Sequence, residues 1–404
     1  MSKLHGVRFS GPLELYAEGF AAELGRLGYK PTGGIKPQLF LVAHLSRWLA
    51  DHGLELTALA SPDVAEEFFA DRRAAGYTNY RTVKALVPLL VYLRELGLVA
   101  APPVVELTAG QVLLERYRGY LISERGLAAS TARGYVDALR GFVATREVDG
   151  GLDLTQLTAG EVTAFVVETC SGQARGSAKM TVTSLRSLLG FLHVDGVLKD
   201  SLVAAVPTAA SWRLAGLPKG LEPDEVSRLL AAPDRRTRTG RRDYAVLMLL
   251  IRLGLRAGEV AALGLEDIDW RAGELIIRGK GDRHERLPLP DEVGTALVSY
   301  LKRGRPSTAE GRRVFVRVRA PHGPMTTGAV SHVVSAAGSR AGLGTVRAHR
   351  LRHTTASHLL AAGAPLAEIG QLLRHRSQLT TAIYAKVDTE ALRTLARPWP
   401  GGVA

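Results

Sequence analysis

Six polar side chains between positions 256 and 384 are of the types that phosphate chemistry requires. Arginine guanidinium groups stay charged and bind phosphate oxygens through paired N–H donors. Histidine and lysine can accept or donate a proton, and a tyrosine hydroxyl becomes a nucleophile when a base helps to remove its proton. Such a set could bind a phosphodiester, attack it and protonate the leaving oxygen. The six residues are Arg256, Lys280, His349, Arg352, His375 and Tyr384.

Each of these residues also has an ordinary structural explanation. Arg256 has Glu259 three positions on, which is the spacing of a surface ion pair on a helix. Lys280 lies in the predicted turn "GKGD", and a turn is a typical position for a solvent-exposed lysine. In "LLRHRSQLTTAIY" the apolar residues have the spacing of a buried helical stripe, so His375 and Tyr384 could be surface residues. The order and spacing of the whole set decide between the two interpretations.

The elements that must position these residues are predicted to be helices and one β-hairpin. "EPDEVSRLLAAP" has proline and acidic residues in its first turn, and the almost wholly apolar "DYAVLMLLIRLG" should be a central buried helix. Arg256 follows this Gly-terminated helix and starts the next one. "GELIIRGKGDRHERLPLP" indicates two short strands with Lys280 at their turn. In "HRLRHTTASHLLAAG", His349 and Arg352 are three residues apart and share one face of a helix.

Two further helical regions precede this one. In the first, Ser61 before Pro62 is a favourable helix start. The second runs from about Thr108 to Leu202. Residues 1–38 carry several Gly and Pro and little periodicity, so no element is predicted there. Apolar residues recur every three or four positions in the three predicted helices of the first region, at 39–53, 61–76 and 79–97.

The two preceding regions resemble each other in part. "LTALASPDV" lines up with "LTQLTAGEV" 98 positions later, and "LLVYLRELGLV" with "LLGFLHVDGVL" 99 positions later, which favours a duplication. The Pro-containing segments "VAAPPVVELT" and "VAAVPTAASWRLAGLPKG" are predicted to be linkers, because proline ends a helix. We therefore predict domains at residues 1–105, 106–210 and 211–404.

The composition points to a polyanionic partner. The net charge is +13 and the pI is about 10, which makes nucleic acid the first candidate. Of the 52 basic residues 42 are arginines, which suits a phosphate-binding surface. Cys170 is the only cysteine, so neither an intrachain disulfide nor a Cys-based zinc site is possible. The N-terminus lacks the apolar run of a signal peptide, and no segment is long enough to span a bilayer, so we expect a cytoplasmic protein without membrane contact.

In their order and spacing the six residues resemble those of the tyrosine recombinase (phage integrase) family. The resemblance rests on "GLRAGE", a lysine on a hairpin 24 residues later, "HRLRHTTASHLL" and "LLRHRSQLTTAIY", and it covers residues 221–387. In the preceding region, "ERYRGYLISERGLAASTARGYVDALRGF" is similar to the family's SAM-like core-binding domain. The resemblance implies a mainly α fold, with a small β hairpin or sheet in the C-terminal catalytic domain and an extra helical module at the N-terminus.

The resemblance also implies a reaction. Tyr384 would attack the scissile phosphate of DNA, form a 3′-phosphotyrosine link and release a 5′ hydroxyl. His349 would accept the Tyr384 proton or position the hydroxyl, and Lys280 would protonate the leaving 5′ oxygen. The covalent link keeps the energy of the phosphoester, so the family requires no metal, nucleotide or other cofactor.

The remaining residues would bind the phosphate. By the resemblance, Arg256 and Arg352 would clamp the non-bridging oxygens, and His375 would donate a further hydrogen bond to them. Glu259 would support the site by orienting an arginine or a histidine. Because these cations carry the electrostatic stabilisation, loss of either arginine should cost orders of magnitude in rate.

This chain departs from the family pattern in two places. The family usually has glycine before the second histidine, where this chain has Arg374. If that position has left-handed backbone, a non-glycine residue costs on the order of 1 kcal/mol there. The other departure is residues 1–105, which are predicted to be helical, whereas the family's extra N-terminal domains tend to be smaller and to contain a sheet. This module could contact DNA or protein.

The resemblance implies double-stranded DNA as the partner, with a homotetramer on two DNA sites and exchange through a Holliday junction. A short amphipathic helix in "AKVDTEALRTLARPWPGGVA" would dock on a neighbouring protomer, and accessory recombination proteins could take part. A type IB topoisomerase or a hairpin telomere resolvase shares the same reactive residues, but the core-binding region favours a recombinase. A DNA-binding relative that no longer cleaves is the other alternative, and such a protein would have no need of Tyr384.

Overall fold

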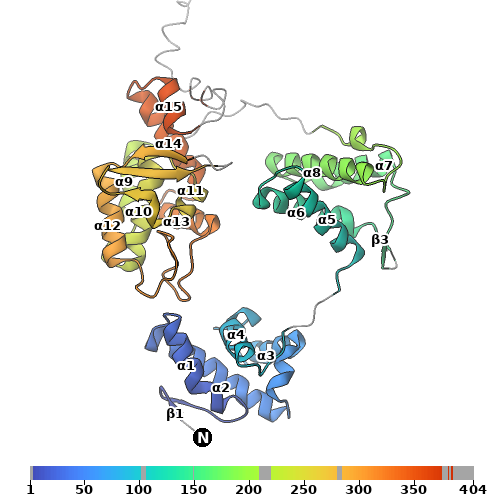
Figure 1. Cartoon of the computed structure of the whole chain (residues 1–404), viewed down its shortest axis with the longest axis vertical. Coiled ribbons are helices and arrows are strands. Elements are labelled where there is room, and N and C mark those ends of the chain that lie inside the picture. Colours follow the sequence, from blue (N-terminus) through green and yellow to red (C-terminus); the bar gives the residue numbers. More distant parts are fainter. Residues whose placement is uncertain are drawn as a thin grey trace, which may run out of the picture. The chain divides into compact units, whose positions relative to one another are not determined.

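The computed structural model confirms a mainly helical fold (Figure 1). Within the described residues, the strands form three small antiparallel sheets. The chain divides into two compact units, residues 1–102 together with 216–404, and residues 103–215. In the described part, no helix is both long enough and apolar enough to cross a membrane. The structure describes residues 3–101, 106–148, 150–208, 220–279 and 284–374, together with Thr381 and Tyr384.

Residues 3–99 surround a hydrophobic core of their own. The elements of this region are β1 (Lys3–Leu4), β2 (Val7–Arg8), α1 (Ala17–Arg26), α2 (Lys36–Asp51), α3 (Pro62–Ala74) and α4 (Val87–Glu95). α3 begins where the sequence predicts, because Ser61 Oγ accepts a hydrogen bond from the Asp63 N–H at 3.3 Å and Pro62 occupies the first turn.

Two features of this region differ from the predicted helices. α4 is much shorter than residues 79–97, because Pro88 belongs in a first helical turn and residues 83–86 form a 3-10 turn ahead of it. α1 and the β1–β2 hairpin lie within the first 38 residues, where no element is predicted. α1 forms because Phe20 and Leu24 bury one face of a short helix, and a helix of ten residues leaves little periodicity to detect.

Residues 106–208 form a helical unit with a separate core. Its elements are α5 (Ala109–Ser123), α6 (Ala129–Ala144), β3 (Glu147–Val148), β4 (Gly151–Leu152), α7 (Ala159–Ser171) and α8 (Arg175–Val194). α5 and α7 each begin with a capping box, formed by Thr108 with Gln111 and by Thr158 with Glu161.

The repeated sequence segments occupy equivalent places in these two regions. "LTALASPDV" leads into α3 and "LTQLTAGEV" into α7, and a hydroxyl residue, Ser61 or Thr158, caps each helix. "LLVYLRELGLV" begins in α4 and "LLGFLHVDGVL" begins in the last turns of α8, and each segment runs past the end of its helix. Each region has four α-helices in its described residues, and the repeated segments belong to the third and fourth, as a duplication would produce.

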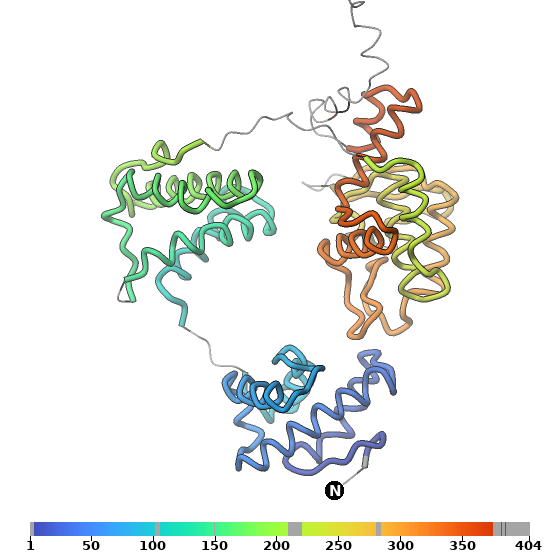
Figure 2. Tube along the Cα trace, turned by 180° about the vertical axis from the view of Figure 1, so that it is seen from behind, coloured from blue at the N-terminus to red at the C-terminus, as the bar shows by residue number. Residues whose placement is uncertain are grey.

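Residues 220–374 hold a third hydrophobic core, built around one buried helix. The helices are α9 (Pro223–Ala231), α10 (Arg238–Arg252), α11 (Ala257–Ala262), α12 (Asp291–Arg303), α13 (Thr327–Arg340), α14 (Ala348–Ala361) and α15 (Leu366–Leu372). Every residue of α10 from Ala245 to Ile251 is buried, as its apolar run predicts. α10 lies beside α12 (Figure 2) and also contacts α11, α13 and α14. At roughly 1.5–3 kcal/mol per buried aliphatic side chain, α10 anchors the helices that carry the candidate residues.

The predicted hairpin is part of a three-stranded sheet with the order β5–β6–β7. The strands are β5 (Ile268–Asp269), β6 (Glu274–Arg278) and β7 (His284–Pro288). Leu275 pairs with Leu287 and Arg278 pairs with His284, so β6 and β7 form an antiparallel hairpin on either side of "GKGD", as predicted. β5 is an additional strand that the sequence did not predict, because two residues are too few to show alternation. Lys280 itself lies outside the described residues.

Candidate active site

Arg256 is held at the start of α11 by the turn that ends α10. The turn contains Gly254, whose φ is +56°, and a Cβ atom there would lie 2.6 Å from Leu373 Cδ2. Only glycine satisfies both the left-handed backbone and this close approach. Arg256 is the N-cap residue of α11, and its side chain is 46% exposed. The backbone of Arg256 is therefore fixed, while its side chain stays partly exposed.

Glu259 holds Arg256 in two ways. One carboxylate oxygen accepts the backbone N–H of Arg256 at 2.8 Å, and the other accepts Arg256 Nη1 at 2.7 Å. Burial raises the pKa of the Glu259 carboxyl, but the charges of Arg374 and Arg256 and the hydrogen bonds from Arg256 outweigh burial and hold the pKa below its usual value. Glu259 is therefore ionised at neutral pH, and the predicted supporting role has a matching contact.

Arg352 is buried in α14 with 2% of its surface exposed. Its Nη1 donates to the Gly254 carbonyl at 2.6 Å, and its Nη2 donates to the Leu373 carbonyl. Burial, followed by the charges of Arg256 and Arg374, lowers its pKa to about 10, so the guanidinium is still charged at neutral pH. Because α14 packs on α10, the charge lies beside Arg256 at a fixed place in the fold.

His349 lies one turn before Arg352 and one turn before a second histidine, His353. The rings of His349 and His353 meet edge to face, with centroids 4.5 Å apart. His353 Nδ1 lies 2.8 Å from the Tyr384 hydroxyl. Burial, the neighbouring Arg352 charge and, for His353, the His349 ring lower the pKa of both imidazoles, and a neutral imidazole can accept a hydrogen bond from the tyrosine.

His353 is a residue that the sequence reasoning missed. Its signal was present, since it follows Arg352 directly and stands four positions after His349, on the same helical face. "HRLRHTTASH" contains three histidines, and nothing in their spacing selects the one that meets the tyrosine. That choice depends on the place of Tyr384, which lies 31 positions away.

Tyr384 is buried, with 2% of its surface exposed, against Ala356, Ile369 and Leu373. Burial raises the pKa of its hydroxyl, and the charge of Arg352 opposes part of that effect. The hydroxyl is therefore neutral at pH 7 and depends on its surroundings for activation. His375 falls outside the described residues, as do the segments on either side of Tyr384.

Arg374 has the left-handed backbone conformation, with a φ of +53°. α15 ends at Leu372 and Leu373 is its C-cap, so Arg374 occupies the following position, where glycine is usual. A non-glycine residue there costs on the order of 1 kcal/mol. The arginine side chain is only 4% exposed, and its Nη2 donates to Glu259 at 2.8 Å.

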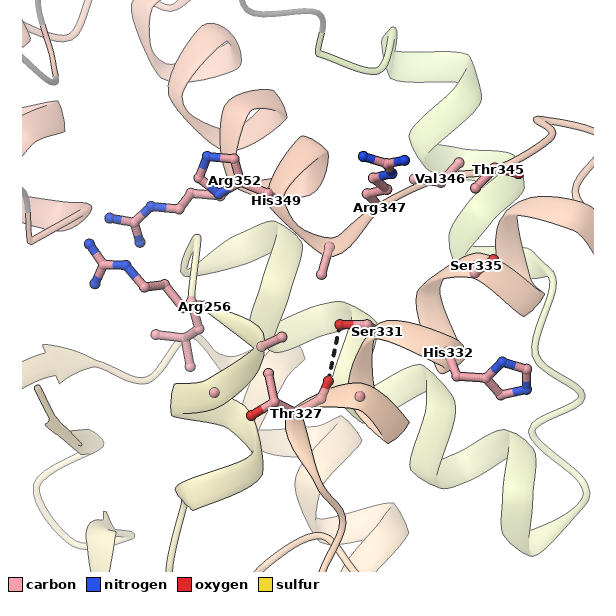
Figure 3. Close-up of a pocket in the computed structure, with 15 residues that line it drawn as sticks. Arg256, Thr327, Ser331, His332, Ser335, Thr345, Val346, Arg347, His349 and Arg352 are labelled. Carbon is pink, nitrogen blue, oxygen red and sulfur yellow. Dashed lines mark hydrogen bonds between the residues drawn. The ribbon is translucent and has the colours of Figure 1, made fainter. Parts of the chain in front are cut away.

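The two candidate arginines line one end of a pocket of about 720 Å³ between α11, α13 and the start of α14. Figure 3 shows the guanidinium groups of Arg256 and Arg352 pointing to the same side, with the His349 ring beside Arg352. Hydroxyl side chains of α13, including Thr327 and Ser331, line another wall. Two adjacent cations at the edge of a cleft suit a bound phosphate. Among the described residues, no three His, Cys, Asp or Glu side chains gather as a metal-binding group.

Comparisons with known proteins decide the family. A sequence model of the phage integrase family matches residues 219–391, and one of the phage integrase N-terminal SAM-like domain matches residues 114–196. The putative integrase/recombinase y4rA of Sinorhizobium fredii is 40% identical over 396 residues, which is 97% of this chain and 95% of that protein. The chain belongs to the tyrosine recombinase (phage integrase) family. The tyrosine recombinase XerD of Mycobacterium tuberculosis is 35% identical to this family member over 306 residues, 71% of this chain and 96% of XerD.

A solved structure supports the same fold for this tyrosine recombinase. The lambda integrase tetramer bound to a Holliday junction matches 77% of this chain and 86% of the integrase chain, with a TM-score of 0.52 and 18% identity. At this identity the likeness concerns the fold alone. The family assignment and the mainly helical architecture predicted from "GLRAGE", "HRLRHTTASHLL" and "LLRHRSQLTTAIY" are confirmed.

Proposed function

We propose that the chain is a site-specific DNA recombinase that cleaves and rejoins strands through a 3′-phosphotyrosine intermediate. The observation that carries the proposal is the meeting of two arginines and a histidine-bonded tyrosine from distant parts of the sequence. Arg352 contacts the turn at Leu373, Arg256 stands across the same turn, and Tyr384 packs on Leu373. A protein that only bound DNA would not require a buried tyrosine beside two phosphate-binding cations.

In the proposed cleavage step, Tyr384 Oη forms a bond to phosphorus and the bond from phosphorus to the 5′ oxygen breaks. The tyrosine proton passes to an imidazole. The contact at 2.8 Å makes His353 a candidate acceptor, while the family resemblance assigns this role to His349, whose ring meets that of His353. Lys280 supplies the proton that the leaving 5′ oxygen takes up.

The phosphate is held through the step by charge. Arg256 and Arg352 stabilise the non-bridging oxygens as the phosphorus becomes five-coordinate, and His375 adds a hydrogen bond. Rejoining reverses the sequence: a 5′ hydroxyl attacks the phosphotyrosine, and Tyr384 leaves as the hydroxyl. Because the covalent link conserves the phosphoester, the cycle balances without a metal ion or a nucleotide.

We assign residues 211–404 to catalysis, residues 106–210 to DNA binding, and residues 1–105 to further DNA or protein contacts. The match of residues 114–196 to the SAM-like domain supports the second assignment. Lambda integrase has been solved as a tetramer bound to a Holliday junction, and we propose the same assembly on double-stranded DNA for this chain. The tail after Tyr384, predicted to dock on a neighbouring protomer, lies outside the described residues.

Covalent trapping tests the proposal. Purified protein is incubated with nicked duplexes tiled across the DNA that flanks its gene, so that the fragment beyond the nick diffuses away after cleavage. An SDS-resistant adduct is expected, with and without EDTA, and Tyr384→Phe should abolish it because phenylalanine lacks the nucleophilic oxygen. An adduct that persists in Tyr384→Phe would contradict the assignment.

The same assay separates the alternatives. A DNA-binding relative without activity would shift the duplexes in a gel mobility assay equally well with and without Tyr384→Phe. It would form no adduct on any of them. A topoisomerase-like enzyme would form adducts on duplexes unrelated to one another and relax supercoiled plasmid. A recombinase forms them at one site and joins the cleaved strand to a second duplex carrying that site.

A further inference from the structure

Three consecutive carbonyl groups at the end of α15 are each held by a different arginine. Arg374 Nη1 donates to the Leu372 carbonyl at 2.9 Å, and Arg352 Nη2 donates to the Leu373 carbonyl. Arg256 Nη2 donates to the carbonyl of Arg374 itself at 3.4 Å. This turn stands directly before the segment that contains His375 and Tyr384. It therefore joins the nucleophile's segment to both candidate phosphate-binding arginines.

The Arg374 side chain reaches back across the same turn. Its Nη2 donates to Glu259 Oε2 at 2.8 Å, the oxygen that also accepts the Arg256 backbone N–H. Among the described residues its Nε has no hydrogen-bond partner, and it lies 4.0 Å from Glu285 Oε2 on β7, the strand that follows the Lys280 turn. A guanidinium with 4% exposure requires pairing, and here the pairing is to the carboxylate that orients Arg256.

We propose that Arg374 is a positioning residue for strand cleavage, which binds Glu259 and so fixes Arg256 against the turn that precedes the nucleophile. This inference rests on the proposed function. A glycine at this position could adopt the same backbone without strain but could not contact Glu259. The contact between the Arg374 side chain and Glu259 therefore offsets the cost of a left-handed backbone at a residue other than glycine.

The electrostatic surroundings of Glu259 fix the expected pH effect. Among the described residues, the cations that interact with it are Arg256, Arg374 and Arg352, and Glu285 on β7 lies 4.0 Å from Arg374 Nε. Loss of Arg374 removes one of these cations from a buried acid, so the pKa of Glu259 rises. Protonated Glu259 releases the Arg256 guanidinium, and cleavage is then lost at a higher pH than in the unaltered protein.

Single-turnover cleavage of a nicked duplex that the unaltered protein cleaves tests the proposal. Arg374→Gly should lower the cleavage rate by roughly 10- to 100-fold, as when a supporting contact of a reactive group is removed, and should move the acid limb of the pH–rate profile to higher pH. Arg374→Lys keeps the charge without the paired donors, so its cleavage rate should lie between those of the unaltered protein and Arg374→Gly. Arg303→Ala, which removes an exposed arginine at the end of α12, is the matched control for net charge and should cleave at the original rate.

Combining Arg374→Gly with Glu259→Gln tests whether Arg374 acts through Glu259 or only by capping the end of α15. Because both substitutions break one contact, the double variant should lose no more rate than the more affected single variant. An unaltered rate and pH profile in Arg374→Gly would overturn the inference. If the glycine variant does not fold, an unaltered rate in Arg374→Lys overturns it instead. If the unaltered protein forms no adduct at all, the proposed function is contradicted. If it forms adducts but Arg374→Gly does not change the rate, only the inference about Arg374 is contradicted.

Discussion

At the scale of single residues, the hydrogen bond between His353 and Tyr384 joins the proposed nucleophile to α14. The hydroxyl is buried, and a buried hydroxyl without a partner destabilises the fold. His353 thus has a structural role whether or not it also accepts the proton. Stability measurements can establish this contact without any knowledge of the DNA site.

The first prediction is a coupling between these two side chains. His353→Ala, Tyr384→Phe and the double variant should give a coupling free energy of about 1 kcal/mol in urea unfolding, because each single substitution breaks the same hydrogen bond. His332→Ala, at an exposed position of α13, is the control and should be additive with Tyr384→Phe. Additivity between His353→Ala and Tyr384→Phe would mean that the contact does not exist in solution.

The second prediction concerns pH. Burial lowers the pKa of His349 and His353 below the ordinary 6.5, so the unfolded chain binds more protons than the folded chain as the pH falls below about 6.5. The free energy of unfolding should therefore be level above that pH and decrease below it. Urea titrations from pH 8 to pH 5 measure this, and a variant with glutamine at both positions should show a shallower decrease. An equal slope in that variant would assign the effect to other groups.

Two pairings among the candidate residues could be predicted from sequence, because short motifs carry them. Arg256 with Glu259, and His349 with Arg352, are close in the chain, and helix geometry alone places each pair together. The partners of Arg374 and His353 could not be predicted, since Glu259 is 115 positions from the one and Tyr384 is 31 positions from the other. Those contacts depend on how α11, α14 and the turn after α15 pack.

At the scale of elements, the turn between α10 and α11 determines where Arg256 can be. The apolar run predicted α10, and two short strand-like segments around a turn at "GKGD" predicted the hairpin. The turn itself depends on Gly254, which accepts Arg352 Nη1 at its carbonyl and leaves no room for a Cβ beside Leu373. Short elements such as α1 and β5 escaped prediction because tertiary packing, and not local pattern, decides whether they form.

The third prediction separates backbone strain from steric conflict at this turn. Gly254→Ala introduces both, because φ is +56° and the new methyl group meets Leu373, whereas Gly311→Ala introduces strain alone, with φ at +81° and no atom within 4 Å. We expect Gly311→Ala to lower the free energy of unfolding by about 1 kcal/mol and Gly254→Ala by roughly 1–3 kcal/mol more. Urea unfolding of both variants provides the comparison. Equal decreases in the free energy of unfolding would show that the turn accommodates the methyl group without a steric penalty.

At the scale of the whole molecule, the charge is unevenly distributed along the chain. Residues 211–404 contain 31 of the 52 Lys and Arg and 18 of the 39 Asp and Glu, a net charge of +13 that equals the charge of the entire chain. Residues 1–210 contain 21 of each sign and are neutral. The electrostatic attraction for a polyanion therefore arises from the region with the candidate active site. We therefore expect the preceding regions to add little to the net electrostatic attraction for DNA.

The fourth prediction follows from this distribution. Binding of the full chain to a random duplex should weaken steeply with salt, with a slope of about 0.9 in log affinity for each phosphate neutralised. Fluorescence anisotropy between 50 and 200 mM salt measures the slope for two sets of exposed arginines changed to glutamine. One set is Arg271, Arg319 and Arg340, and the other is Arg47, Arg133 and Arg175.

The first set should weaken binding more and flatten the salt dependence by about one unit for each arginine that meets a phosphate, because those arginines belong to the positive region. The second set removes the same charge from the neutral regions, so its effect should be limited to any direct contact that it breaks. If both sets changed the slope equally, phosphate contacts would be spread along all three predicted domains. The net charge of a region would then be a poor guide to its contacts with DNA in this protein.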